Sequence, residues 1–133
     1  MTGASRSARL HLLRGGVLAG ALLAGGALAQ PALKDAAGHP VVARDASRIV
    51  SVGGSITEIL YALGEQNKIA AVDVTSVYPP QALNDKPNVG YMRQLSPEGV
   101  LGVRPSLIIA TEGSGPKETL AVLDAAKIPL VLV

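Results

Sequence analysis

The chain has 133 residues, 48% of them hydrophobic, which is enough for about one domain with a packed core. Three of its 12 basic residues and none of its 10 acidic residues lie in the first 29 positions, so residues 30–133 carry a net charge of −1. The sequence pI of about 9.2 therefore reflects the N-terminus and gives no support to a nucleic-acid partner. The absence of cysteine excludes disulfides, thiolate metal sites and a cysteine-linked lipid.

Residues 1–29 have the three parts of a secretory signal peptide. Arg6, Arg9 and Arg14 form a basic flank, the run GGVLAGALLAGGAL is apolar, and residues 27–29 fit an A-x-A cleavage site. The apolar run is shorter than the roughly 18 residues typical of a membrane-spanning helix, which makes an uncleaved anchor the less favoured alternative. We expect a periplasmic protein with no stable membrane insertion after the signal is cleaved.

Residues 30–47 form a polar N-terminal lead-in, and regular structure begins at residue 48. The sequence RIVSVGG predicts a short strand that ends in two glycines. A helix follows, for which Ser55 is the expected N-cap, Glu58 completes a capping box, and Gly64 marks the end. The sequence KIAAVDV predicts a second strand.

The stretch from Thr75 to Leu95 has neither a helical period nor the alternation of a strand. It contains Pro79, Pro80 and Pro87, and we expect one long ordered loop. Long loops of this kind inside a compact domain are usually functional.

Strands and helices alternate again after this loop. LSPEGVLGVRP predicts a helix with Ser96 as N-cap, Pro97 at the first helical position and Pro105 at its end. SLIIAT is an expected strand, GPKETLAVLDAAK a helix opened by Pro116, and IPLVLV a further strand. Such alternation is typical of an α/β fold with a parallel sheet, whose ligands lie beyond the carboxyl ends of the strands.

Catalytic and metal-binding patterns are weak in this sequence. Gly53-Gly54-Ser55 is compatible with phosphate binding at a helix N-terminus, but a tight turn with a cap explains it better. GSGPKET lacks the spacing of a phosphate loop. His39 is the single histidine after the signal, so a metal site with several histidine ligands cannot be built from residues 30–133. We expect no enzymatic activity.

The three tyrosines are the remaining candidates for a binding site. Tyr61 lies on the first expected helix, where packing accounts for it. Tyr78 and Tyr91 lie in the long loop, where an exposed ring needs a reason. From the residues alone, packing of the loop against the domain and contact with a ligand are equal alternatives for both.

Two segments carry specific motifs. They are VDVTSVYPPQAL, with a T-S-x-Y-P core, and NVGYMRQLSPEGVLGVRPSLIIA, with G-Y-x-R-x-L-S-x-E-G. These motifs resemble those of the haem-binding periplasmic proteins of bacterial ABC importers, which belong to a larger group that also carries vitamin B12 and ferric siderophores. The segment RIVSVGGSITEILYALG is shared by the whole group. Many haem-binding relatives have Thr where this chain has Val74.

The resemblance implies a Rossmann-like lobe of a two-lobe periplasmic binding protein, truncated here. Residues 48–133 would be its N-terminal α/β ligand-binding lobe, and incomplete. Tyr78 would be the axial ligand of the haem iron, Tyr91 would line the pocket, Arg93 would pair with a propionate, and Glu98 would dock onto the permease. Each of the last two residues also has a simpler explanation. Arg93 could be a solvated surface arginine, and Glu98 could serve as a favourable charge at a helix N-terminus.

The resemblance also implies the ligand and the partners. We expect haem b (hemin) as the transported ligand, the permease and ATPase of an ABC importer as partners, and a monomer. The alternatives are the same scaffold carrying a corrinoid or a ferric siderophore and, in a different class, a secreted α/β enzyme.

Overall fold

The computed structural model describes residues 33–133, so the predicted signal peptide lies outside the described residues. Four strands form one sheet in the order β2-β1-β3-β4, and every neighbouring pair is parallel. The strands are β1 (Ile49–Val52), β2 (Ile69–Val72), β3 (Leu107–Ala110) and β4 (Leu130–Leu132). The prediction of a parallel α/β fold is therefore confirmed.

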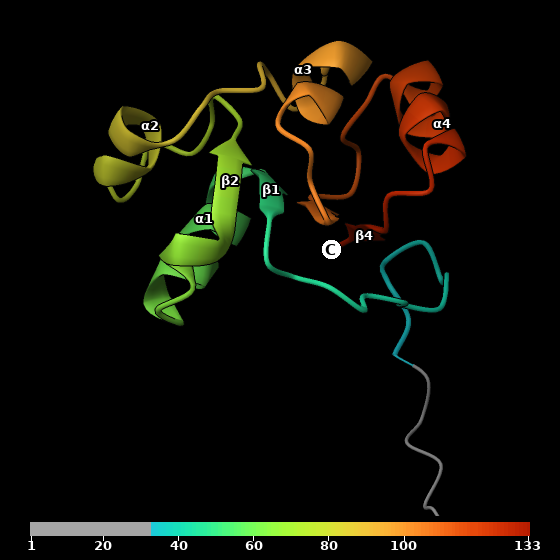
Figure 1. The fold of residues 1–133 in the computed structure, drawn as a ribbon, viewed down its shortest axis with the longest axis horizontal. Coiled ribbons are helices and arrows are strands. Elements are labelled where there is room, and N and C mark those ends of the chain that lie inside the picture. The colour runs from blue at the N-terminus through green and yellow to red at the C-terminus, as the bar shows by residue number, and fades with distance from the viewer. Residues whose placement is uncertain (1–32) are drawn as a thin grey trace, which may run out of the picture. The chain divides into compact units, whose positions relative to one another are not determined.

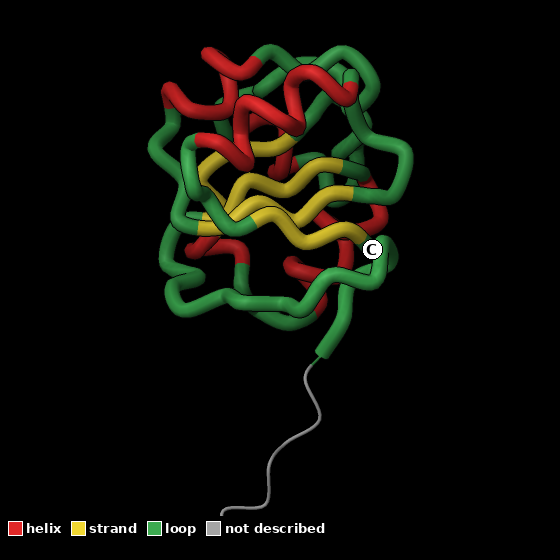
Figure 2. The backbone as a smooth tube through the Cα atoms, turned by 90° about the vertical axis from the view of Figure 1, so that its right-hand side faces the viewer, coloured by secondary structure: helices red, strands yellow, loops and turns green. Residues whose placement is uncertain are grey.

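Four α-helices and one short 3-10 helix connect the strands (Figure 1). They are α1 (Gly54–Ala62), η1 (Gln66–Lys68), α2 (Gln81–Asp85), α3 (Pro97–Gly102) and α4 (Lys117–Ala125). Helix α1 lies on one side of the sheet, and α3 and α4 lie on the other, so the strands form a middle layer (Figure 2). The strands are apolar runs because both of their faces are covered.

Alternate residues of the strands fill two separate apolar clusters. Side chains of a strand point to opposite faces in turn, so Ile49 and Val50 enter different clusters. Val50 joins Ile108 and, from the helices, Val100 of α3 and Leu123 of α4. Ile49 packs with Ile69, Leu107, Ile56 and Leu60 in the cluster under α1. Burial of each of these side chains contributes roughly 1.5–3 kcal/mol.

The start of α1 differs from the sequence prediction. Its N-cap is Gly53, whose carbonyl accepts hydrogen bonds from the amides of Ile56 and Thr57, at 3.1 and 3.2 Å. Ser55 is already inside the helix, and no side chain of α1 caps it, so the predicted capping box of Ser55 and Glu58 is wrong. The reason is that groups outside the helix satisfy its first amides.

The end of α1 agrees with the prediction. Leu63 is the C-cap, and Gly64 follows with a φ of 76°, a left-handed conformation that favours glycine. Its amide donates to the carbonyl of Tyr61 at 3.0 Å. Gly64 therefore turns the chain away from the helix towards η1 and β2.

The loop from residue 75 to 95 is not free of secondary structure, because it contains the five-residue helix α2. Pro80 stands at its N-cap, where the missing proline amide costs nothing, and Ala82 is its one buried residue. A helix this short offers too few residues for an apolar period to be visible in the sequence. The expectation of an irregular loop is thus wrong for residues 81–85.

The predicted start of α3 is confirmed, and its predicted end is not. The Ser96 hydroxyl accepts a hydrogen bond from the amide of Gly99 at 2.9 Å, and Pro97 is the first helical residue. The helix ends at Gly102 rather than at Pro105. Arg104 has a φ of 49°, so the chain has left the helical conformation before the proline.

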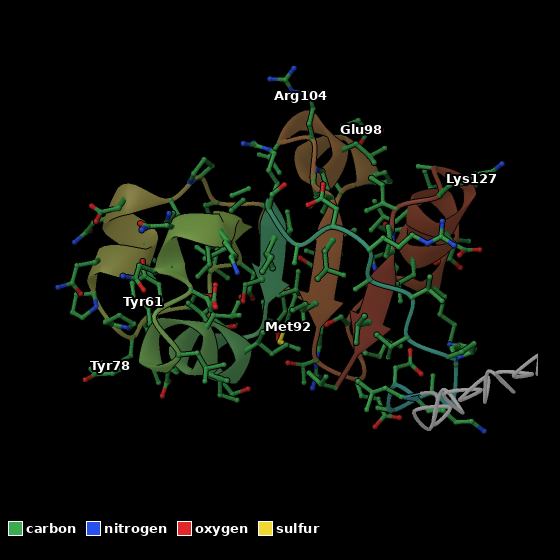
Figure 3. All side chains as sticks on the ribbon, turned by 60° about the horizontal axis from the view of Figure 1, so that its bottom comes forward. Tyr61, Tyr78, Met92, Glu98, Arg104 and Lys127 are labelled. Carbon is green, nitrogen blue, oxygen red and sulfur yellow. The ribbon has the colours of Figure 1, made fainter. Side chains whose placement is uncertain are left out.

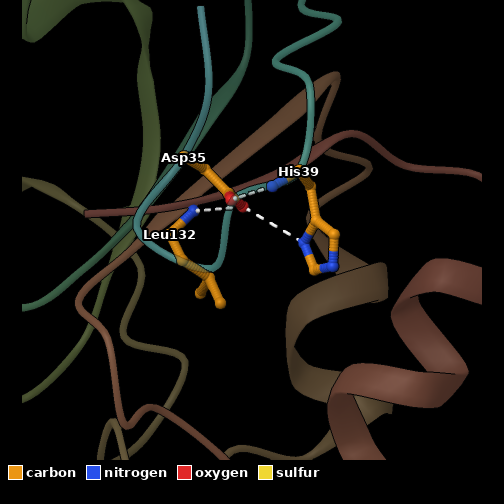
Figure 4. Close-up of polar contacts among 3 residues, drawn as sticks. All are labelled: Asp35, His39 and Leu132. Atoms are coloured by element: carbon orange, nitrogen blue, oxygen red, sulfur yellow. Dashed lines mark hydrogen bonds and ion pairs between the residues drawn. The ribbon is translucent and has the colours of Figure 1, made fainter.

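Residues 33–41 of the lead-in segment form a small hairpin beside β4. The amide of Asp35 donates to the carbonyl of His39 at 2.9 Å, and the Asp35 carboxylate accepts from the His39 amide at 2.7 Å and from the Leu132 amide at 3.5 Å (Figure 4). The amide of Ala36 donates to the carbonyl of Leu132 at 2.8 Å. These contacts hold the hairpin against the edge strand.

Candidate functional site

The loops that follow β1, β2 and β3 meet at the carboxyl edge of the sheet. The segment around Tyr91 joins two of them, since the amide of Val74 donates to the carbonyl of Gly90 at 2.9 Å. The amide of Gly115 donates to the carbonyl of Met92, also at 2.9 Å, and the amide of Leu95 donates to the carbonyl of Gly115 at 3.0 Å. The long loop is therefore ordered, and it lies where a parallel α/β sheet is expected to bind ligands.

Asp73, the first residue after β2, is fully buried at this edge. Its Oδ1 accepts from the amide of Gly53 at 2.9 Å and from the hydroxyl of Ser76 at 3.1 Å. The hydroxyl of Thr75 lies 2.9 Å from Oδ1 and 2.8 Å from Oδ2, and the Thr75 amide lies 3.3 Å from Oδ2. One carboxylate thus links the start of α1 with the start of the loop that carries Tyr78.

A chain of buried hydroxyl groups extends this network into the sheet. Ser76 Oγ lies 2.7 Å from Thr57 Oγ1, which lies 2.7 Å from Ser51 Oγ. Ser51 belongs to β1 and Thr57 to α1, and all three residues are fully buried. The loop is consequently fixed to a strand and to a helix through side chains.

Tyr78 follows this network by two residues, and its side chain is 63% exposed. It lines an open groove of about 660 Å³, within the roughly 300–1,000 Å³ of small-molecule sites. The other lining residues come mainly from α1, η1 and α2: Glu58, Tyr61, Ala62, Gln66, Asn67, Pro79, Gln81, Asp85 and Lys86. In Figure 3, Tyr61 and Tyr78 lie on the same side of the molecule. The phenol is accessible to a ligand.

The two phenols in this groove have different surroundings. Burial of Tyr61 raises the pKa of its phenol, and the negative charge of Asp85 raises it further. Tyr61 therefore stays neutral and is a poor source of an anionic oxygen. Its place in the groove was not predicted from the sequence, which indicated only that Tyr61 packs as part of the helix.

Tyr91 and Arg93 are exposed and lie on the segment that bridges the β2 and β3 loops. They belong to the same edge of the sheet as Tyr78, but they do not line its groove. Glu98 is an exposed residue in the first turn of α3, and Figure 3 shows it well apart from Tyr78. The structure thus separates the four predicted residues into a groove residue, two edge residues and a helix-terminus residue.

The glycine pair at the start of α1 does not leave its amides free for a phosphate. The amide of Gly53 donates to Asp73, and that of Gly54 donates to Thr75 Oγ1 at 2.9 Å. Within residues 33–133, no group of three or more His, Cys, Asp or Glu is arranged to hold a metal ion. Over the same residues, no helix has the length and apolar character needed to cross a membrane.

Comparison of the sequence with known protein families identifies the class of protein to which this fold belongs. A model described as periplasmic binding protein matches residues 49–133, and the chain belongs to that family. This agrees with the α/β lobe and with the resemblance seen in its loop motifs.

Solved structures of haem-binding proteins are similar to this chain. The apo form of the periplasmic heme-binding protein RhuT from Roseiflexus sp. RS-1 is 46% identical, with a TM-score of 0.63, over 66% of this chain and 34% of that one. A periplasmic heme-binding protein from Pseudomonas aeruginosa is also 46% identical, with a TM-score of 0.62, over 65% and 31% of the two chains.

A vitamin B12-binding protein is among the curated relatives. The protein from Yersinia pestis (strain Pestoides F) is 35% identical over 88 residues, which are 66% of this chain and 31% of that protein. The chain therefore spans about a third of the length of the relatives it matches.

Proposed function

We propose that the protein is a periplasmic substrate-binding protein that captures haem through Tyr78 and delivers it to the permease of an ABC importer. The observation that carries the proposal is the position of Tyr78, an exposed phenol on an ordered loop at the carboxyl edge of a parallel sheet. The protein binds and releases its ligand, and the importer's ATPase supplies the energy of transport.

The chemistry of a phenol suits ferric haem. An ordinary tyrosine ionises near pH 10, but Fe(III) is a strong Lewis acid, and tyrosinate is an established axial ligand of haem. A hard anionic oxygen favours the ferric state over the ferrous state. Tyr78 can reach an incoming iron because its side chain is mostly exposed, whereas Tyr61 is half-buried and held neutral.

Two of the comparisons support haem as the proposed ligand. Two proteins described as heme-binding are 46% identical to the chain, and the vitamin B12-binding protein is 35% identical over a similar length. The same scaffold carrying a corrinoid is the second candidate, because both kinds of relative match the same part of the chain.

The other predicted residues have supporting roles in this proposal. Tyr91 stacks on the macrocycle, and Arg93 pairs with a propionate, because both are exposed at the edge that carries Tyr78. Glu98 docks onto the permease, for which an exposed carboxylate away from the groove is suited. Its charge also stabilises the N-terminus of α3 by roughly 0.3–1 kcal/mol.

A haemin titration tests the proposal. The wild-type protein is expected to give the visible spectrum of a ferric tyrosinate haem, and Tyr78→Phe is expected to abolish it because the substitution removes only the phenolic oxygen. Tyr61→Phe is the matched control from the same groove, and it should keep the wild-type spectrum. An unchanged spectrum in Tyr78→Phe would rule out the iron–phenolate bond.

Cyanocobalamin distinguishes the second candidate. A haem carrier keeps its haemin spectrum when cyanocobalamin is added in excess. A corrinoid carrier instead binds cyanocobalamin and gives only a weak haemin spectrum, and the Tyr78→Phe substitution does not change that spectrum. A secreted enzyme would bind neither ligand specifically.

A further inference from the structure

We propose that Asp73 is a positioning residue for Tyr78. Its buried carboxylate and the hydroxyl chain from Ser51 fix the segment that presents the phenol to its ligand. The role rests on the proposed function as far as haem is concerned, while the order of the segment is a property of the protein without ligand. Tyr78 lies two residues beyond Ser76, the last member of the network.

The direction of the hydroxyl chain follows from the number of protons. A hydroxyl has one proton to donate. Ser76 donates to Asp73, so it accepts from Thr57, and Thr57 in turn accepts from Ser51. Each hydroxyl in the chain therefore donates towards the carboxylate. The last hydroxyl, that of Ser76, needs an acceptor that has no proton of its own.

The partners of Asp73 do not compensate a charge in the way that an ion pair does. Among the described residues, its hydrogen bonds come from amides and hydroxyl groups, all of them neutral. Taking a carboxylate out of water costs several kcal/mol even in a relaxed protein. An apolar residue would fill the same space without that cost, so the carboxylate is explained by the geometry it imposes on Gly53, Thr75 and Ser76.

Amide hydrogen exchange of the ligand-free chain tests whether Asp73 orders the segment. Asp73→Asn keeps the size of the side chain but replaces one of the two acceptor oxygens with N–H₂. The amide that bonds to the replaced atom, that of Gly53 at Oδ1 or that of Thr75 at Oδ2, should therefore exchange about tenfold faster or more. Asp45→Asn is the matched control, because Asp45 also accepts a backbone amide, from Ser47 at 2.8 Å, but precedes β1. It should leave these rates unchanged.

Haemin binding tests whether this order matters to the ligand. Asp73→Asn is expected to weaken haemin binding about tenfold and to shift the ferric tyrosinate bands. Thr57→Val interrupts the hydroxyl chain with a side chain of the same shape and should have the same effect, whereas Thr57→Ser keeps the hydroxyl and should restore the wild-type spectrum. If Asp73→Asn does not fold, this valine and serine pair decides the question.

The outcomes separate the two proposals. Wild-type exchange rates and a wild-type haemin spectrum in both Asp73→Asn and Thr57→Val would overturn the positioning role, even if Tyr78→Phe abolishes the spectrum. A wild-type spectrum in Tyr78→Phe would instead overturn the proposed function and the role of Asp73 towards haem. The exchange rates would then still show whether Asp73 orders the segment.

Discussion

Two adjacent glycines decide how closely the loops of the binding edge approach α1. A Cβ atom on Gly53 would lie 2.1 Å from Thr111 Oγ1, and one on Gly54 would lie 2.4 Å from the carbonyl oxygen of Thr75. Both distances are far inside van der Waals contact. The second is the more restrictive, because a backbone atom cannot rotate away as a side chain can.

Gly54→Ala should therefore destabilise the protein, by about 1–3 kcal/mol, because the backbone at Thr75 has to move. Gly102→Ala is the matched control. Gly102 also lies in a helix, and a Cβ there meets open space, so alanine should be neutral or stabilise by up to about 1 kcal/mol. Thermal unfolding followed by circular dichroism measures both. Equal midpoints for the two variants would contradict the contact with Thr75.

At the scale of elements, α1 and α3 each have a serine near their start but begin in different ways. Ser96 caps α3 with its own hydroxyl, and Ser55 lies inside α1, where Gly53 is the N-cap. Loss of an N-cap hydroxyl costs typically about 1 kcal/mol. Ser96→Ala should thus lower the free energy of unfolding by that amount, and Ser55→Ala should change it by less than about 0.5 kcal/mol. Denaturant unfolding compares them, and an equal loss in both would restore the capping role of Ser55.

The hairpin at Asp35 should depend on pH. Burial of the Asp35 carboxyl raises its pKa, but the hydrogen bonds from the amides of His39 and Leu132 outweigh this effect, and the pKa lies below its ordinary value of 3.8. The carboxylate therefore stabilises the hairpin at pH values above 3.8, and this contribution is lost as the pH falls through the lower pKa of the folded state.

Backbone amide shifts in NMR spectra measure this dependence. Between pH 6 and pH 2, the amide resonances of His39 and Leu132 should titrate together with a midpoint below 3.8, and that of Ile108 in β3 should serve as the reference. Asp35→Asn lacks this carboxyl group, so the titration step that the two amides share should be absent from the variant. A midpoint above 3.8 would mean that the hydrogen bonds do not dominate.

The elements that the sequence predicted correctly are those with a strong local signal. The apolar runs were sufficient to predict the four strands, and Ser96-Pro97 was sufficient to predict the start of α3. The start of α1 was not predictable locally, because its first amides bond to Asp73 and Thr75, about 20 residues further along the chain. Helix α2 was missed because five residues with one buried side chain show no period.

The candidate site was predicted in part for the same reason. Tyr78 could be singled out because an exposed ring in a proline-rich loop needs an explanation, and its family motif is specific. Asp73 stands two residues before Thr75, a spacing at which an acidic side chain commonly bonds to the backbone, and this signal was available. The place of Tyr61 in the groove depends on how α1 and α2 pack, which no spacing in the sequence shows.

At the scale of the whole molecule, the described residues should unfold as one cooperative unit. The two apolar clusters lie on opposite faces of the same sheet, and neighbouring residues of each strand contribute to both. A face cannot lose its packing without exposing the strands that support the other. We therefore expect a single transition whichever cluster is weakened.

Leu60→Ala in α1 and Leu123→Ala in α4 test this coupling from the two faces. Each removes a buried leucine side chain, so each should cost about 2–5 kcal/mol and lower the melting temperature by about 10–30 °C. Leu63→Ala is the control, because Leu63 is 69% exposed and its loss should cost less than about 0.5 kcal/mol. Tyrosine fluorescence reports in part on the face of α1, through Tyr61, which packs there, and circular dichroism reports on all helices. Coincident midpoints from the two probes are expected in each variant, and a Leu123→Ala protein that melts by circular dichroism while its tyrosine signal stays native would show that the faces unfold separately.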